Sequence, residues 1–382
     1  MLIFHGEVKY LDRIFSFAFS HPRLDLKADY VNLSSPNETN RLVSVLKNIP
    51  SLRALYLSNT QLTLSSLEPL MHGLSHVSVL EELDLNGIWS YDGTEMEILK
   101  VGLSNVPHLT VLRLRGVTAM GMSRPAPGIR HLTGLKELDL SHSSIGIMGD
   151  IGLESLATVL PLFTAMQVLV LESACIRGYT GMQKLLPALC HLTELVKLDI
   201  GYNNNILKDP GLQGLTGTLI NLTAIRVLDL IATGISDRGV SALVKVLPHL
   251  VRLQVLDVRN DDIGDSEIIS LVQTLCQSSK LDMGQNPPGD KSLTTADHCN
   301  TTLQELDIGV NSGVTAAGLA KVVQLISALP ALTKLGMAGH FPATHLPDNV
   351  ALALTEALPK LPVLEKLDLL LISNTGEADV FL

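Results

Sequence analysis

Three adjacent residues offer the most obvious chemistry in the sequence. Asp297, His298 and Cys299 place an acid, a base and a thiol side by side. A catalytic triad needs proximity in space, however, and adjacency in sequence does not supply its geometry. The four cysteines show no CxxC spacing, which argues against a structural zinc site, and no phosphate-binding GxxxxGK[ST] loop occurs. The sequence therefore predicts a protein that is not an enzyme and has no cofactor or metal.

Aspartates recur at one position of a repeated segment. Between the last two leucines of each copy, the chain reads Asp25, Tyr56, Asp84, Arg113, Asp139, Val170, Asp199, Asp229, Asp257, Asp282, Asp307, Gly336 and Asp368. Neighbouring like charges repel, and Lys197, Lys280, Lys334 and Lys366, two residues earlier, offer partial compensation. Two interpretations stay open. In the first, the aspartates are a recurrent structural feature of the repeat, solvated and paired with lysines. In the second, they form an acidic stripe that binds a basic or hydrogen-bond-donating partner.

Other side chains could contribute to a binding surface. Arg113 and Arg115 interrupt the acidic column, and the only tryptophan, Trp89, follows a leucine segment rather than lying within one. Tyrosine, tryptophan and arginine dominate protein-binding hot spots. The predicted binding residues are Tyr56, Asp84, Trp89, Tyr91, Arg113, Arg115, Asp139, Glu172, Asp199, Tyr202, Asp229, Asp257, Arg259, Asp282 and Asp307.

A repeated leucine segment must position these residues. Leucine, two variable residues, leucine, one variable residue and leucine recur in thirteen copies, two of them weaker (Leu24-Leu26 and Leu281-Met283), at a mean interval of about 28.6 residues. The end of each copy alternates as a strand does, and helical spacing follows, as in Leu153, Leu156 and Leu160. Parallel strands lie closer together than packed helices, so the array should curve, with strands on the concave face and helices on the convex face.

The chain thus reads as an α/β solenoid of about 13 repeats. We expect an N-terminal capping segment at 1–20, the repeat array at 21–374 and a C-terminal tail at 375–382. The prolines of 123–128 and 286–289 disfavour helices and predict irregular convex segments there.

Composition limits the partners. With 28 Lys and Arg against 38 Asp and Glu, the formal net charge is −10, which disfavours nucleic acid as the primary partner. No apolar run is long enough for a membrane span, and the charged N-terminus is unlike a signal peptide. With only four cysteines, a cytoplasmic location is the expectation, and the oligomeric state is left open.

Several segments resemble a known family. LEELDLNG, GLKELDLSHSSIG, VRLQVLDVRNDDIGDSE and TLQELDIGVNSGVTAAGLAKVV look like leucine-rich repeats of the ribonuclease-inhibitor subtype. DDIGDSEIISLVQTL is similar to repeats at the C-terminal end of NLR innate-immune receptors. The resemblance implies a module for pattern recognition or autoregulation that binds a protein or microbial ligand. It leaves an inhibitor of a basic enzyme or an activator of a small GTPase as the alternative. The chain departs from the family because the turn position that usually holds Asn or Cys varies here, so we expect the turns to vary too.

Overall fold

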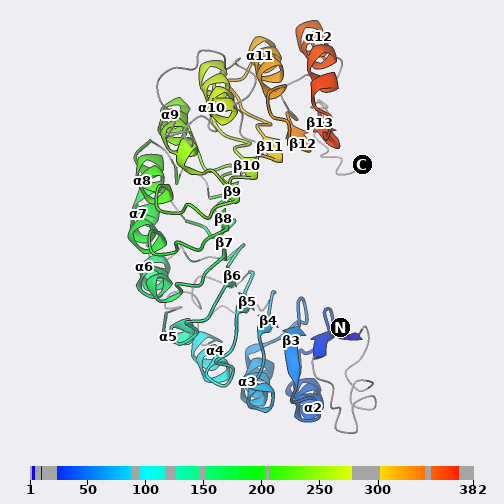
Figure 1. The fold of residues 1–382 in the computed structure, drawn as a ribbon. Coiled ribbons are helices and arrows are strands. Elements are labelled where there is room, and N and C mark those ends of the chain that lie inside the picture. The colour runs from blue at the N-terminus through cyan, green and yellow to red at the C-terminus, as the bar shows by residue number, and fades with distance from the viewer. Residues whose placement is uncertain are drawn as a thin grey trace, which may run out of the picture. The chain divides into compact units, whose positions relative to one another are not determined.

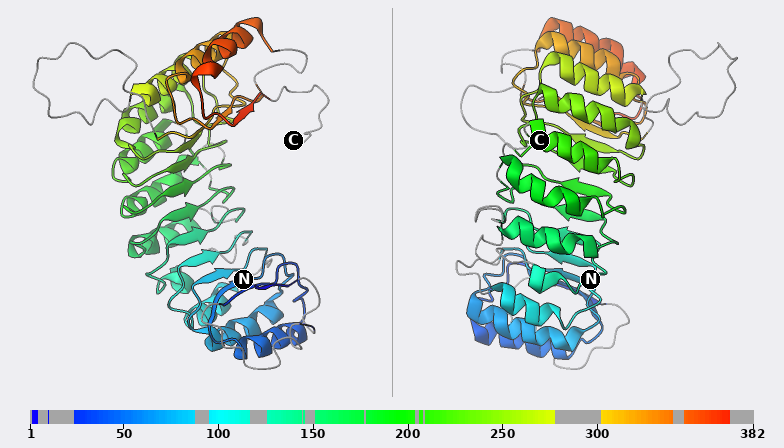
Figure 2. Two further views of the ribbon diagram at one scale, coloured as in Figure 1. Left: turned by 45° about the vertical axis from the view of Figure 1, so that its right-hand side comes forward. Right: turned by 90° about the vertical axis from the view of Figure 1, so that its left-hand side faces the viewer.

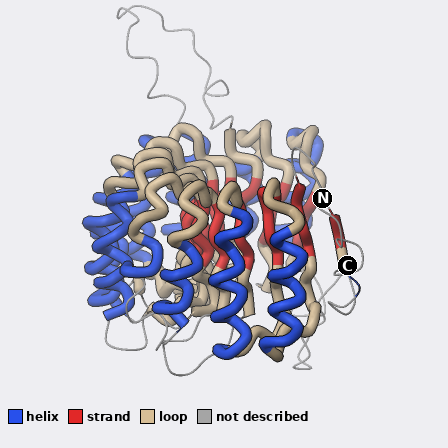
Figure 3. Tube along the Cα trace, turned by 90° about the horizontal axis from the view of Figure 1, so that it is seen from below, coloured by secondary structure: helices blue, strands red, loops and turns tan. Residues whose placement is uncertain are grey.

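The structure is a computed structural model with two compact units, Met1–Asn203 and Asn204–Leu382. It describes residues 2–4, 10, 24–87, 95–116, 126–143, 145, 151–176, 178–203, 206–207, 209–277, 302–339 and 346–369. In each unit the helices lie along one face of a parallel sheet, and no described helix covers the other face (Figure 1; Figure 3). We call the uncovered side the open face.

The first unit alternates strands and helices. Its strands are β1 (Leu2–Ile3), β2 (Leu24–Lys27), β3 (Leu52–Tyr56), β4 (Glu82–Asp84), β5 (Val111–Arg113), β6 (Glu137–Asp139), β7 (Val168–Val170) and β8 (Lys197–Asp199). Its helices are α2 (Pro36–Lys47), α3 (Leu64–Gly73), α4 (Glu95–Leu103), α5 (Ala126–Ile129), α6 (Ile151–Val159) and α7 (Gly178–Leu189), with 3-10 turns η1 (Leu74–Val77) and η3 (Leu160–Leu162). The strands pair in sequence order and in parallel.

The second unit has the same plan. Its strands are β9 (Val227–Asp229), β10 (Val255–Asp257), β11 (Glu305–Asp307), β12 (Lys334–Gly336) and β13 (Lys366–Asp368). Its helices are α8 (Asp209–Leu219), α9 (Asp237–Val246), α10 (Asp265–Gln277), α11 (Ala316–Ile326) and α12 (Asp348–Ala357), with 3-10 turns η4 (Leu247–His249) and η6 (Leu358–Lys360). Figure 2 shows the helices of this unit stacked side by side. These strands also pair in parallel and in order.

Stacked leucines in one register form the core of the fold. The central leucines of β3 to β8, from Leu55 to Leu198, occupy one register and are fully buried under the helices. The helices of this unit bury an apolar stripe on the same side of the sheet, such as Leu153, Leu156 and Val159 of α6. Burying one leucine side chain contributes about 1.5–3 kcal/mol, so the repeated leucine is the main stabilising residue. These features establish the predicted α/β leucine-rich repeat architecture.

A left-handed residue ends the turn after each strand from β2 to β12. Positive φ angles occur three residues after the last strand residue, where the chain turns away from the sheet. In the first unit these residues are Tyr30, Asn59, Gly87, Gly116, His142, Ser173 and Tyr202, and in the second they are Ala232, Asn260, Val310 and Gly339. Most are not glycine, and the left-handed conformation costs an L-residue roughly 1–2 kcal/mol. The stacked repeats therefore impose this turn on sequences that do not favour it.

Two sequence predictions are wrong in register. β10 pairs directly with β11, with Leu256 opposite Leu306, so the weak copy at Leu281-Met283 forms no strand between them. Twelve strands, β2 to β13, follow β1 within the described residues, rather than thirteen repeats. At the other end the register shifts by a bulge between β2 and β3, so that Lys27, and not Asp25, lies opposite Tyr56.

The proline-rich stretch at 123–128 was expected to lack a helix, but its residues 126–128 belong to α5, a helix of four residues, so the prediction is wrong there. Residues 123–125 and the second proline-rich stretch at 286–289 lie outside the described residues. Within the expected cap at 1–20, Leu2 and Ile3 form β1, which extends the sheet beside β2. The tail at 375–382 lies outside the described residues.

Candidate binding face

Two rows of side chains cross the open face of each unit. Row 1 contains the residue before each central leucine, and row 2 contains the residue after it. Row 1 reads Ala54, Glu82, Val111, Glu137, Val168 and Lys197 in the first unit, and Val227, Val255, Glu305, Lys334 and Lys366 in the second. Row 2 reads Tyr56, Asp84, Arg113, Asp139, Val170 and Asp199 in the first unit, and Asp229, Asp257, Asp307, Gly336 and Asp368 in the second.

Side chains in the first unit pair between neighbouring strands. The Tyr56 hydroxyl donates to Glu82 Oε2 at 2.7 Å, and Arg113 Nε donates to Glu137 Oε1 at 2.7 Å. Burial and the bond to Glu82 raise the pKa of Tyr56. Burial acts to lower the pKa of Arg113, but the charge and hydrogen bond of Glu137 outweigh it and the pKa rises. The pairs hold an arginine and a tyrosine in fixed positions on this face.

The row 2 aspartates are bound to their own turns. In six of them Oδ1 accepts the main-chain N–H two residues later, as in Asp139 to Ser141 at 2.9 Å and Asp257 to Arg259 at 3.0 Å. The same bond is made by Asp84, Asp199, Asp229 and Asp307. Five of these residues are buried: Asp84, Asp139, Asp199, Asp257 and Asp307. Burial raises the pKa of Asp84 and acts against its ionised form. The aspartate column thus stabilises the turns, and its role as an acidic stripe stays a prediction.

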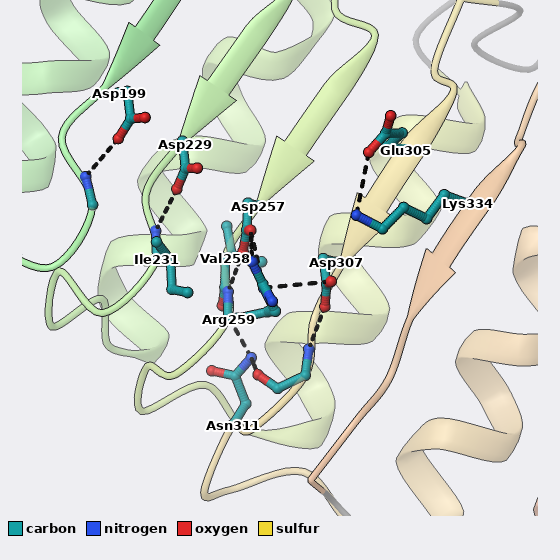
Figure 4. Close-up of polar contacts among 12 residues, drawn as sticks. Asp199, Asp229, Ile231, Asp257, Val258, Arg259, Glu305, Asp307, Asn311 and Lys334 are labelled. Carbon is teal, nitrogen blue, oxygen red and sulfur yellow. Dashed lines mark hydrogen bonds and ion pairs between the residues drawn. The ribbon is translucent and has the colours of Figure 1, made fainter. Parts of the chain in front are cut away.

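Arg259 joins two carboxylates in the second unit (Figure 4). Its guanidinium contacts Asp257 Oδ2 at 2.6 Å and Asp307 Oδ2 at 3.4 Å. Burial raises the pKa of Asp307 to about 6, while Arg259 lowers it and Asp257 raises it. Beside this group, Lys334 Nζ lies 3.4 Å from Glu305 Oε2. A Cβ atom on Gly336 would lie 2.1 Å from the Asp307 carboxylate, so glycine provides the space that this carboxylate occupies.

Lysine pairing follows the expectation only in part. Lys197 lies 3.3 Å from Asp199 on the same strand, as the compensating column predicts. Lys334 pairs instead with Glu305, which belongs to row 1. Lys280 lies outside the described residues.

The turn position that was expected to vary makes several kinds of contact. Asn203 and Asn311 each donate from Nδ2 to three main-chain carbonyls. Thr60 and Thr233 instead donate their hydroxyls to the carbonyl three residues earlier. Asp261 accepts three main-chain N–H groups of the preceding repeat. The contacts at this position vary as expected, but the left-handed conformation of the turn itself is repeated.

The remaining predicted residues fall into three groups. Tyr202 is exposed at the left-handed turn position, and Glu172 lies near exposed His142, with 4.0 Å between Oε2 and Nε2. Arg115 lies 4.0 Å from Asp139. Trp89, Tyr91 and Asp282 lie outside the described residues. The direct pairing of β10 with β11 removes Asp282 from the position predicted for it between Asp257 and Asp307.

Sequence reasoning missed most of row 1. Glu82, Glu137 and Glu305 each pair with a residue on the next strand or the preceding one. Their signal was present, because they lie two residues before the row 2 position and therefore on the same side of the strand.

Metal ligands and membrane-spanning helices would be further features of the described ranges. No group of three or more His, Cys, Asp or Glu side chains there is placed to hold a metal ion. No helix within those ranges has both the length and the hydropathy needed to cross a membrane.

Comparisons with known proteins find similarity among solved structures. No protein-family model matches the chain, and no curated protein sequence matches it. Among solved structures, the chain is similar to an internalin from Listeria monocytogenes, with 20% identity and a TM-score of 0.38. That alignment covers 80% of this chain and 83% of the internalin chain.

Proposed function

We propose that the chain is a binding module that holds a protein or microbial ligand against the open face and the adjoining turns. The observation that supports this is the in-register pairing of half-buried polar side chains, above all Arg113 with Glu137 and Lys334 with Glu305. Side chains held in place before binding lose less conformational entropy when a partner arrives. A stable interface needs about 1,000 Å² or more in total, so several repeats would have to take part.

The similarity of its segments to NLR repeats supports a more specific role. We infer that the module is the sensing or autoregulatory region of a cytosolic innate-immune protein. Its exposed tyrosine at the turn after β8, Tyr202, and the half-exposed Val168 and Val170 on β7 supply apolar contact area beside the charged pairs. Aromatic and aliphatic side chains beside anchored charges are typical of protein-binding surfaces.

A pair of charge reversals tests the location of binding. Replacing row 2 aspartates would disturb their turns, so the variants reverse ion pairs instead: R113E/E137R in the first unit and E305K/K334E in the second. The matched control is E154K/K184E, which reverses the 2.7 Å pair between α6 and α7 on the helix side. Pull-down from cell lysate and microbial extract should lose its ligand with at least one open-face variant and keep it with the control. Unchanged capture by both open-face variants would contradict the proposal.

A second candidate function is supported by charge. Rows 1 and 2 of β3 to β8 carry five acidic and two basic residues, and those of β9 to β13 also carry five and two, an excess of three negative charges in each unit. An acidic face complements a basic enzyme, as in inhibition of a ribonuclease. The added protein should then slow a basic ribonuclease, or accelerate GTP hydrolysis by a small GTPase, at a low molar ratio. No change in either rate would dismiss this alternative.

A further inference from the structure

The turn after β10 contains a carboxyl group where the turns after β8 and β11 contain an amide. In the repeat of β11, Asn311 accepts the Asp261 N–H at Oδ1 and donates from Nδ2 to the Ile308 carbonyl, three residues earlier, at 2.8 Å. Asn203, after β8, makes the corresponding bond to the Ile200 carbonyl at 2.9 Å. Asp261 occupies this position after β10. An amide there is both acceptor and donor, and an ionised carboxylate is an acceptor only.

One oxygen of Asp261 is satisfied and the other is not. Oδ1 accepts the N–H groups of Thr233, Gly234 and Ile235 at 3.1, 2.7 and 3.0 Å. Oδ2 is buried without a hydrogen-bond partner, in a residue that is 6% exposed. A buried polar atom without a partner is unfavourable, and much more so when it carries charge. A proton on Oδ2 would give this oxygen the donor role of the asparagine Nδ2.

We propose that Asp261 carries a proton in the folded protein and donates it to a main-chain carbonyl of its own turn, so that this turn is a pH-sensitive clasp between the repeats of β9, β10 and β11. At acid pH the clasp has the hydrogen bonds of an asparagine turn. As pH rises, Asp261 loses this proton to water. The resulting carboxylate is buried beside other hydrogen-bond acceptors, which destabilises the contacts between the three repeats.

The charges around the turn agree with this assignment. From the strand ends to the first turn of the following helices, the charged groups on these three repeats are Asp229, Asp237, Arg238, Asp257, Arg259, Asp262, Asp265, Glu267 and Asp307. Arg259 is held by Asp257 and Asp307. Burial raises the pKa of Asp261 to about 7, the three main-chain N–H bonds lower it, and the charge of Asp257 raises it further.

The sign of the pH effect follows from linkage. The ordinary pKa of 3.8 applies in the unfolded chain, and the folded value is higher. The unfolded state therefore gives up this proton first, and stability is lost as pH rises from about 4 to about 7. Within that window the unfolding equilibrium constant should increase about tenfold per pH unit from this group alone.

The test compares D261N with D262N, which changes an exposed aspartate of the same turn whose oxygen accepts only the Ser312 hydroxyl. Denaturant unfolding is measured between pH 5 and 8.5. We expect wild type and D262N to lose stability with rising pH, and D261N to lose much less, because its amide donates at every pH. An unchanged pH slope in D261N overturns the proposal.

Infrared spectroscopy of the wild-type protein gives a readout that does not depend on a variant folding. A protonated carboxyl absorbs above the amide band, and this band should vanish with a midpoint near pH 7. Asp307 should titrate earlier, near pH 6. If D261N fails to fold, the absence of a carboxylic-acid band with the later midpoint overturns the proposal by itself.

Discussion

The row 2 aspartates show how one residue type can look like a binding site and serve the backbone. Their spacing is regular because the strands from β2 to β12 are followed by the same turn, and six of the carboxylates accept the N–H two residues later in that turn. A side-chain acceptor two residues before an N–H is a common way for aspartate to stabilise a turn. The regularity therefore needs no ligand to explain it.

Substitutions at Asp139 distinguish the contribution of its hydrogen bonds in the turn from the contribution of its negative charge. Its Oδ1 accepts both the N–H and the hydroxyl of Ser141, which is 1% exposed. D139A leaves a buried N–H without its acceptor and should lower the free energy of unfolding by about 1–3 kcal/mol. D139N keeps an acceptor oxygen and should lose less than half of that amount. Urea denaturation followed by circular dichroism measures both, and an equal loss in the two variants would assign the effect to charge.

Gly336 provides a second test at this scale. A Cβ atom there would lie 2.1 Å from the Asp307 carboxylate, so G336A must displace the pair that Asp307 forms with Arg259. We expect a destabilisation of about 1–3 kcal/mol. The control is G217A on α8, where a Cβ meets nothing within 4 Å. Because alanine is the better helix former, this control should stabilise the protein by roughly 0.5–1 kcal/mol. Measured by calorimetry, the melting temperature should fall in G336A and rise in G217A.

At the level of elements, leucine spacing predicted the strands and their order, because a buried leucine at a fixed place leaves little choice of register. The sequence did not predict the turn conformation, since Tyr30, Ala232 and Val310 adopt positive φ under the constraint of their neighbours. It also misplaced Asp282, because Leu281 and Met283 mimic a repeat in a segment that the sheet bypasses. A local sequence pattern shows which segments are able to form a strand. Pairing with neighbouring strands determines which of these segments join the sheet.

One polar contact links successive helices on either side of that bypassed segment. Asp265, at the start of α10, accepts the N–H and the hydroxyl of Thr315, and Thr315 Oγ1 accepts the Gly318 N–H as the N-cap of α11. T315A should lower stability by about 0.5–2 kcal/mol through the lost cap. D265A should be destabilising as well, and because the residues share a contact, the double variant should lose less than the sum. Denaturant unfolding of the two single variants and of the double variant measures the coupling free energy. If the stability losses of the single variants add up to that of the double variant, the coupling is contradicted.

The bypassed segment matters at the scale of the whole molecule. The connection from α10 to β11 has 27 residues, 278 to 304, whereas those from α7 to β8, α8 to β9 and α11 to β12 each have seven. The hydrogen bonds between β10 and β11 form across it, as do the contacts of Asp265 with Thr315. The second unit is therefore continuous in its packing although its sequence period is interrupted.

Removing residues 281–300 should consequently leave the fold intact. The deletion leaves 27 − 20 = 7 residues between α10 and β11, the length found in the other three connections. Because loop length changes stability only slowly, we expect the free energy of unfolding to change by less than about 1 kcal/mol. Removing the same number of residues at 316–335 instead takes α11 and part of β12, and should unfold the second unit. Circular dichroism and calorimetry compare the two deletions. If the protein unfolds when residues 281–300 are removed, the prediction is wrong, and residues 278–283 must contribute to the fold as a repeat does.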